Sequence, residues 1–229
     1  IFNEKKYFCY VAAFGVISDV SYITSQKSKH KYGRLAYYAN AIKELKNMLK
    51  EYDFEVCSLK DEDINIDVVE DGNTFEENAL KKASEIYNYL LANNKGDALV
   101  LADDSGLEVD YLNGEPGIYS ARYSGEHGND YANNIKLLDK MKSAKGEDRR
   151  GRFVCALALI GNDTKEVIRG TVEGYIKEEL IEGDFFGYDP LFFYPEFNKT
   201  FAEASAEEKN AVSHRGNALA ELKKILTQL

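Results

Sequence analysis

The sequence contains little cysteine and little histidine. The three residues of each type are far apart and lack the spacing of metal ligands; they are Cys9, Cys57, Cys155, His30, His127 and His214. An odd number of distant cysteines argues against a disulfide framework or a zinc site. Thiols that stay reduced are typical of the cytoplasm, which is therefore the expected location.

Basic residues are too few for a nucleic-acid surface. Lys and Arg total 29 against 39 Asp and Glu, which gives a formal net charge of -10. Because binding along a phosphate backbone needs a basic face, this balance excludes an extended nucleic-acid surface but allows an acidic enzyme with a local basic pocket. No membrane partner is expected, since the chain has no run of about 18 apolar residues that could span a bilayer.

The chain is long enough for one sizeable core, or for a core with a smaller lobe, because 44% of its 229 residues are apolar. No repeat or low-complexity linker divides it. Residues 1–19 are treated as a leader of unknown structure: Lys5 and Lys6 followed by an apolar stretch faintly match a signal peptide, without a clear cleavage pattern. A single α/β domain is expected over residues 20–229.

The stretch around which the chain is organised is an apolar run that ends on two adjacent carboxylates. Residues 98–102 show no polar alternation, which is typical of a strand buried on both faces of an α/β sheet. Asp103 and Asp104 follow, and Ser105-Gly106 then predicts a sharp turn. Because open α/β sheets bind ligands at the carboxyl ends of their strands, the two acids are candidate catalytic residues. The alternative is that they only start the turn, a common role of Asp.

These residues carry a resemblance to a known family. The motif Ala102-Asp103-Asp104-Ser105-Gly106-Leu107, continued by Asn-Gly-Glu-Pro-Gly-Ile-Tyr-Ser-Ala-Arg-Tyr over 113–123, resembles the inosine triphosphate pyrophosphatase family, whose members hydrolyse deaminated purine nucleoside triphosphates. Further blocks match in order, so the resemblance covers about residues 20–229. It implies an elongated central mixed sheet flanked by helices, a smaller second lobe with a substrate cleft between the two, and a homodimer.

A second block of the family, over 70–83, contains a helix start. Thr74 and Glu77 have the spacing of a capping box, which predicts a long helix to about residue 94. The resemblance implies that Glu70 helps to hold magnesium and that Lys82 faces the substrate. The alternatives are a solvated loop acid for Glu70 and a snorkelling surface side chain for Lys82.

A weaker block lies near the amino terminus. The family opens with a strand, matched here by 20–23, and a phosphate-binding loop of the form Thr or Ser, any residue, Asn, two residues and Lys. Thr24, Gln26 and Lys29 keep this spacing, and their side chains can donate hydrogen bonds to phosphate oxygens. A second register, Tyr38-Ala39-Asn40-Ala41-Ile42-Lys43, falls inside an amphipathic helix predicted over 35–52. A charged segment that binds nothing is a further alternative.

Another helix and a hairpin are predicted between the two strongest blocks. Asn129 caps a helix that continues to about Lys142, with three apolar residues facing inward, namely Ile135, Leu138 and Met141. Residues 153–160 predict a buried strand, and 166–177 its more exposed partner. A hairpin of this kind at the end of the sheet could form the smaller lobe.

The last block, over 186–193 and 206–216, can recognise a purine. Phe186, followed by Gly187, offers a flat apolar face, and Tyr188 and Asp189 can reach the edge of the base. A second group, Lys209, His214 and Arg215, brings three donors together. A 6-keto purine presents an acceptor where adenine presents an amine, so these donors favour the keto base over ATP. Guanine shares the keto group, so GTP must be excluded elsewhere.

The same block also has a purely structural interpretation. Ser205 and Glu208 have the spacing of a capping box, and His214-Arg215 can simply open a last helix over 217–229.

Together, the motifs resemble those of a magnesium-dependent pyrophosphatase that converts ITP, dITP and XTP to the monophosphate and pyrophosphate. Glu70 and Asp104 would hold magnesium, the ion suited to carboxylates and phosphates, and Asp104, alone or with Asp103, would activate the water. The substrate-binding set is Thr24, Gln26, Lys29, Lys82, Ser105, Phe186, Gly187, Tyr188, Asp189, Lys209, His214 and Arg215. Two alternatives stay open: a catalytically impaired nucleotide-binding protein of the same fold, and a generic magnesium phosphatase.

Overall fold

A computed structural model describes residues 6–12, 54–59, 61–181 and 186–228. The predicted phosphate-loop residues Thr24, Gln26 and Lys29 lie outside the described residues, as do the second register over 38–43 and the helix predicted over 35–52. The strand predicted over 20–23 lies outside them as well.

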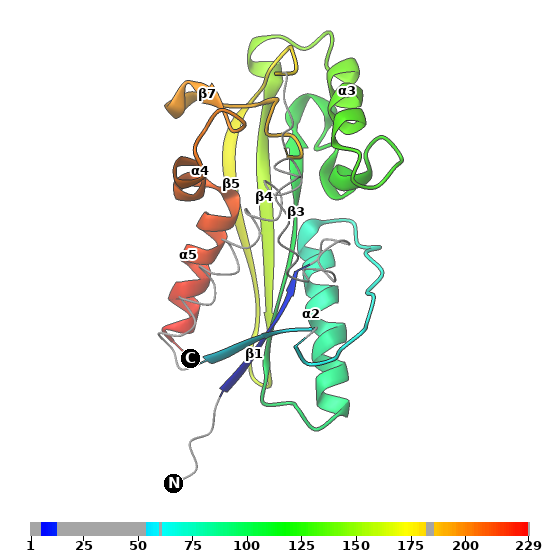
Figure 1. The fold of residues 1–229 in the computed structure, drawn as a ribbon, viewed down its shortest axis with the longest axis vertical. Coiled ribbons are helices and arrows are strands. Elements are labelled where there is room, and N and C mark those ends of the chain that lie inside the picture. The colour runs from blue at the N-terminus through cyan, green and yellow to red at the C-terminus, as the bar shows by residue number, and fades with distance from the viewer. Residues whose placement is uncertain (1–5, 13–53, 60, 182–185, 229) are drawn as a thin grey trace, which may run out of the picture.

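The described residues form one mixed sheet. Its strands are β1 (Lys6–Ala12), β2 (Phe54–Ser58), β3 (Leu99–Val109), β4 (Arg150–Ile160), β5 (Lys165–Ile176), β6 (Phe192–Tyr194) and β7 (Lys199–Thr200). They are ordered β2-β1-β3-β4-β5-β6-β7, with β2, β1 and β3 parallel and the other pairs antiparallel. Figure 1 shows β3, β4 and β5 running along the long axis of the molecule. The predicted mixed sheet is confirmed, whereas the smaller lobe and the cleft stay predictions.

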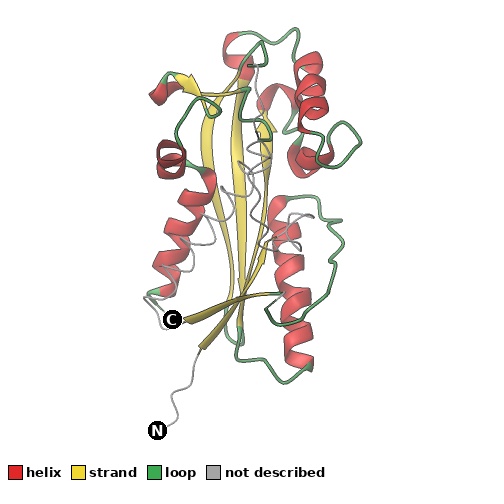
Figure 2. Cartoon of the chain, viewed as in Figure 1, coloured by secondary structure: helices red, strands yellow, loops and turns green. Residues whose placement is uncertain are grey.

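Helices cover both faces of this sheet. In the described part of the chain the α-helices are α2 (Phe75–Ala92), α3 (Asp130–Lys140), α4 (Ala206–Val212) and α5 (His214–Leu226). Short 3-10 helices are η2 (Asp110–Leu112), η3 (Gly117–Arg122), η4 (Gly146–Arg149) and η5 (Pro195–Phe197). Figure 2 shows α2 and α5 in red on opposite sides of the yellow strands. None of the helices in the described ranges is long and apolar enough to cross a membrane.

The apolar core is divided by the faces of the long strands. Val100 and Ala102 of β3 pack in the cluster under α2, whereas Leu101 packs with Ala218 and Leu222 of α5. This division follows from the period of two in a strand, which points neighbouring side chains to opposite faces. The position of a residue along β3 therefore decides which helix it meets.

Part of the predicted leader belongs to the sheet. β1 lies between β2 and β3, and its Cys9 is almost fully buried. The stretch Tyr-Phe-Cys-Tyr-Val-Ala over 7–12 is rich in aromatic and apolar residues, as suits a strand with a parallel partner on each side. Residues 6–12 thus form a strand inside the sheet.

The strand that was predicted to end at Ala102 continues to Val109. β4 pairs with β3 from Val100 to Val109, whereas the pairing with β1 ends at Asp103. The prediction of a turn at Ser105-Gly106 is wrong, because antiparallel hydrogen bonds to β4 keep this segment extended. Gly106 serves close packing instead: a Cβ there would lie 2.4 Å from Ser120 Oγ and 2.8 Å from Phe75 Cζ.

The two long predicted helices are confirmed, with changes in detail. Thr74 Oγ1 accepts the Glu77 amide of α2 at 3.1 Å, but the Glu77 carboxylate reaches the amide of Asn73 at 2.6 Å instead of that of Thr74. On α3, the prediction that Ile135 faces inward is wrong: it is 42% exposed, and Leu137 is fully buried in its place.

The β4 and β5 hairpin is also confirmed, but not at the end of the sheet. Both strands lie inside it, and β6 and β7 extend the sheet beyond β5. The structural interpretation of the last block is confirmed in part, since Ser205 and Glu208 form a complete capping box on α4 and His214 is the first residue of α5.

Candidate active site

Two of the predicted carboxylates share one buried ammonium group. Lys82 Nζ on α2 lies 2.7 Å from Glu70 Oε1 and 3.6 Å from Asp104 Oδ1 of β3. The side chain of Lys82 is 3% exposed, so the alternative of a snorkelling surface lysine is wrong. Glu70, in the loop before α2, is the most accessible of the three. Three charged residues from distant parts of the sequence therefore form one compact group in the folded chain.

The environment of Asp104 favours a proton acceptor near neutral pH. Burial raises the pKa of Asp104 to about 6, with Glu70 and Asp103 adding to the rise while Lys82 and a hydrogen bond from Asn78 oppose it. A carboxylate with such a pKa is ionised at neutral pH and can accept a proton. Its affinity for that proton is high enough for it to act as a base in a transition state. Asp104 is thus a candidate general base.

Asn78 is a site residue that the sequence analysis missed. Its Nδ2 donates to Asp104 Oδ2 at 3.0 Å, and its Oδ1 accepts from the Gly72 amide at 2.8 Å. One buried amide therefore ties β3 to the loop that carries Glu70. The available signal was an Asn four residues before Lys82, on a helix face that is otherwise apolar and includes Ala79 and Ala83.

The two adjacent aspartates serve opposite faces of the sheet. Asp103 is fully buried and accepts a hydrogen bond from Arg215 of α5 at 2.9 Å, whereas Asp104 points to α2. Arg215 also donates to Ser105 Oγ at 3.4 Å, and Ser105 donates its amide to Asp104 Oδ1 at 3.1 Å. Ser105 thus contacts both Arg215 and Asp104. Asp103 is a partner of Arg215 on the face opposite Asp104, and its action together with Asp104 stays a prediction.

Close approach of α5 to the sheet sets the position of His214 and Arg215. A Cβ on Gly170 of β5 would lie 2.2 Å from the His214 carbonyl oxygen and 2.4 Å from the Ala218 amide nitrogen. These are backbone atoms, so a larger residue would push the start of α5 away. Gly170 therefore allows His214 and Arg215 to lie against β4 and β5.

His214 is held as a neutral ring. Its imidazole stacks on Phe153 with ring centroids 5.2 Å apart and an interplanar angle of 22°. Burial, followed by the charges of Arg215 and Lys209, lowers the pKa of His214 well below its usual value. Within the part of the chain that the structure describes, Nδ1 is buried without a hydrogen-bond partner. A buried nitrogen without a partner lowers the stability of the folded protein unless a ligand supplies the missing hydrogen bond.

The Phe186 to Asp189 segment is held mainly by bonds within the protein. The Gly187 amide donates to Asp130 Oδ2 at 2.9 Å, and the Tyr188 hydroxyl donates to the Ser120 carbonyl at 2.9 Å. Asp189 is buried and pairs with Lys209, while Phe186 is only half-buried. The polar ends of Tyr188 and Asp189, predicted to reach a base, are thus engaged with protein groups.

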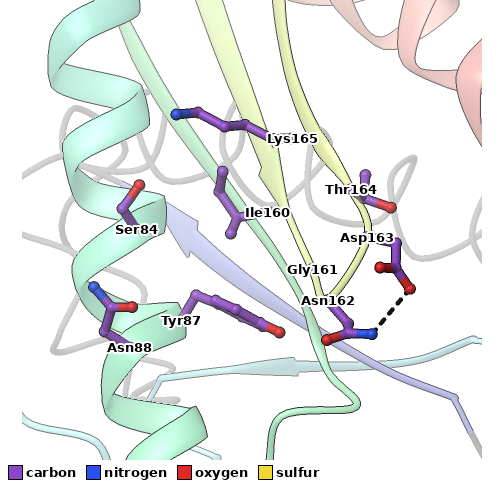
Figure 3. Close-up of a pocket in the computed structure, with 9 residues that line it drawn as sticks. All are labelled: Ser84, Tyr87, Asn88, Ile160, Gly161, Asn162, Asp163, Thr164 and Lys165. Carbon is purple, nitrogen blue, oxygen red and sulfur yellow. Dashed lines mark hydrogen bonds between the residues drawn. The ribbon is translucent and has the colours of Figure 1, made fainter.

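A surface hollow of about 540 Å³ lies away from these charges. Figure 3 shows it between the later turns of α2, with Ser84, Tyr87 and Asn88, and the β4 to β5 turn, with Asn162 and Lys165. It contains none of the predicted site residues. The hollow is therefore not the site indicated by the sequence motifs.

The Glu70 and Asp104 pair fits a divalent ion that takes part of its shell from a ligand. Within the described ranges, no group of three or more His, Cys, Asp and Glu converges as a metal cage. Mg²⁺ in proteins commonly uses one or two carboxylates and completes its octahedron with phosphate oxygens and water. Two carboxylates that are held close by one ammonium are compatible with that arrangement.

Comparison with known proteins agrees with these motifs. A sequence model of the Ham1 family matches residues 39–225, a range that includes Asn40 and Lys43 but begins after Thr24, Gln26 and Lys29. The dITP/XTP pyrophosphatase of Clostridium perfringens is 53% identical over 186 residues, which cover 81% of this chain and 91% of that protein. The dITP/XTP pyrophosphatase of Clostridium tetani is 50% identical over 82% of this chain and 91% of its own length.

Solved structures give the same grouping. The Staphylococcus aureus Ham1 protein is 37% identical and superposes with a TM-score of 0.75, covering 97% of this chain and 99% of that one. A HAM1 protein from Coxiella burnetii is 30% identical with a TM-score of 0.73 and the same coverage. From its motifs, its fold and these matches, the chain belongs to the Ham1 family.

Proposed function

We propose that this protein hydrolyses non-standard purine nucleoside triphosphates, ITP, dITP and XTP, to the monophosphate and pyrophosphate and so removes them from the nucleotide pool. The observation that carries the proposal is the group of Glu70, Lys82 and Asp104, in a chain 53% identical to a protein named dITP/XTP pyrophosphatase. The alternative of an impaired nucleotide binder is not supported, because relatives with that name match over about four fifths of the chain.

In the proposed mechanism, Asp104 accepts a proton from the attacking water. Its pKa of about 6 leaves it ionised at pH 7 and above. The water oxygen attacks phosphorus, the bond between the α and β phosphates breaks, and pyrophosphate leaves. Lys82 contributes positive charge beside the polyphosphate, where negative charge develops. Asn78 holds the Asp104 carboxylate in a fixed orientation.

Magnesium is part of this proposal. Glu70 and Asp104 would hold the ion against the phosphates, and the ion would supply charge neutralisation and polarise the phosphoryl oxygens. With the ion bound, both carboxylates gain a cationic partner in addition to Lys82. Two observations support this assignment: both carboxylates lie close to Lys82, and Glu70 is partly exposed.

Base selection is assigned to the group on the other face of β3. The buried His214 Nδ1 can accept a hydrogen bond, or donate one if it carries the proton, and the half-buried ring of Phe186 offers a stacking surface. A 6-keto base would satisfy a donor there, whereas the amine of adenine would leave it unpaired. Arg215, which pairs with Asp103, follows His214 directly at the start of α5, and both Arg215 and Lys209 place positive charge near the ring.

The phosphate grip near the amino terminus has two proposed registers. One uses Thr24, Gln26 and Lys29, and the other uses Asn40 and Lys43. The range matched by the family model supports the second register. Separate Lys29→Met and Lys43→Met variants distinguish them. Loss of the lysine that binds phosphate should raise KM for the nucleotide, whereas loss of the other lysine should leave KM unchanged.

We also propose a homodimer located in the cytoplasm. The family resemblance supports the dimer, and a substrate drawn from the free nucleotide pool supports the location. Light scattering of the purified chain tests the first, since a monomer mass at micromolar concentration would contradict it.

Pyrophosphate release from ITP, XTP, dITP, GTP and ATP with Mg²⁺ tests the function. We expect turnover of ITP, XTP and dITP with kcat/KM at least about 100-fold above that for ATP, because loss of a complementary buried hydrogen bond disfavours the wrong base strongly. Chelation of the metal should stop the reaction. Equal hydrolysis of ATP would indicate a generic phosphatase, and saturable ITP binding without turnover would indicate the impaired binder.

Removal of the Asn78 amide should impair catalysis more than binding. In Asn78→Ala, Asp104 loses its donor and the Gly72 amide loses its acceptor, so we expect kcat to fall roughly 10- to 100-fold, as for other partners that orient metal-binding carboxylates. KM for ITP should change much less. Asn88→Ala is the matched control, because Asn88 is an exposed residue of the same helix. A kcat equal to that of the control would remove Asn78 from the site.

A further inference from the structure

Two cysteines that are distant in the sequence are direct neighbours in the sheet. Cys9 of β1 lies opposite Cys57 of β2 in the parallel register. Neighbouring strands are about 4.8 Å apart, which is inside the Cα separation of about 4.4 to 6.8 Å found across disulfides. The backbone therefore already has the spacing that a bond between the two sulfurs requires.

The side chains of the two cysteines also meet. Both pack on the face of the sheet that α2 covers, and their thiols are joined by a hydrogen bond. Cys9 is 1% exposed, whereas Cys57 is half-buried. The third cysteine, Cys155, packs under α5 on the opposite face. Cys57 is thus the member of the pair that a small solute can reach.

The two thiols differ in chemical character. Their mutual hydrogen bond lowers the pKa of Cys57 and, together with burial, raises the pKa of Cys9. Because Cys57 is the accessible member of the pair and the thiolate is the reactive form, Cys57 is the nucleophile and Cys9 is positioned as the resolving thiol.

We propose that Cys9 and Cys57 form a reversible dithiol/disulfide site that reacts with a small hydroperoxide. The Cys57 thiol loses its proton, its sulfur forms a bond to one oxygen of hydrogen peroxide as the O–O bond breaks, and the leaving hydroxide takes up an equivalent proton to become water. The Cys9 sulfur then attacks the Cys57 sulfenic acid, the S–O bond breaks, and the Cys9 proton leaves with the hydroxyl group as a second water. Two thiols lose two electrons in total, and a dithiol reductant reverses the reaction.

This site is independent of the proposed hydrolase function. It has its own measurable consequence for stability, because the bond would close a loop of roughly 50 residues in the unfolded chain. For a protein of this size, such a restriction should raise Tm by roughly 5 to 15 °C. Oxidation of a single thiol to a sulfenic or sulfinic acid closes no loop and predicts no such increase.

The test is peroxide treatment of the full chain, followed by unfolding, alkylation and mass spectrometry. We expect only one of the three thiols to remain alkylatable, a linked pair of peptides that contain Cys9 and Cys57 from one molecule, and an increase in Tm. Dithiothreitol should restore all three thiols and the original Tm.

Two variants keep the result decisive. Cys155→Ala should form the same link and show the same increase in Tm, whereas Cys57→Ser should keep both remaining thiols and show no increase. The proposal is overturned if the wild type keeps three alkylatable thiols, if its links join two molecules, or if Cys57 is oxidised while Cys9 stays alkylatable. Loss of thiols in Cys57→Ser would point to Cys155 and would also overturn it.

Discussion

Replacement of Asp104 by Asn is expected to reduce kcat for ITP by roughly 100- to 10,000-fold, the range usual for loss of a general base. The amide has nearly the same shape, so it can still accept from Asn78, but it can neither take a proton from water nor carry charge beside Glu70. KM should change little by comparison. The measurement is steady-state pyrophosphate release. Asp139→Asn, which changes an exposed carboxylate on α3, is the matched control.

The same substitution should stabilise the metal-free protein. Because burial raises the folded-state pKa of Asp104 to about 6, its stabilising contribution is complete below the unfolded pKa of about 4 and is lost as pH rises through about 6. Asn never ionises, so the variant should gain on the order of 2 to 3 kcal/mol over the wild type at pH 7.5 and almost nothing at pH 4. Denaturant unfolding with a chelator present measures this difference. An unchanged kcat would exclude Asp104 from the chemistry, and an equal gain at both pH values would contradict the pKa argument.

Replacement of Arg215 by Met is expected to destabilise the protein by about 3 to 5 kcal/mol. Asp103 has no exposed surface, and removal of Arg215 takes away the cation that faces this buried carboxylate. Lys224→Met, which breaks an exposed pair with Glu221 on the same helix, should cost less than about 1 kcal/mol. Thermal and denaturant unfolding compare the two variants directly.

A double variant separates the pair from the packing of Arg215. Asp103→Leu with Arg215→Met should recover much of the lost stability, because apolar side chains often replace a buried ion pair at little cost. It should not recover base selection if His214 depends on Arg215 for its position. A single Arg215→Met variant as stable as Lys224→Met would show that the buried pair contributes little.

Local features of the fold could be predicted from the sequence because short-range physics controls them. Thr74 and Ser205 were identified as helix caps from spacing alone, and both accept the predicted amide. The β4 and β5 hairpin followed from an apolar run, turn residues and a second run. The inward face of α3 was predicted less well, since Ile135 and Leu137 are equally apolar and only the packing of the neighbouring elements decides which one is buried.

By itself, the sequence determined which residue types the protein possesses at its conspicuous motifs: two adjacent aspartates, a helix with Lys82, and a His-Arg pair at the start of the last helix. Tertiary structure alone decided that the aspartates separate, because β4 keeps β3 extended beyond Ala102 and a strand alternates its faces. It also decided that Cys9 meets Cys57, since parallel pairing joins segments irrespective of their distance along the chain. Non-local strand pairing has no local sequence signal, which is why these two arrangements could be found only in the folded molecule.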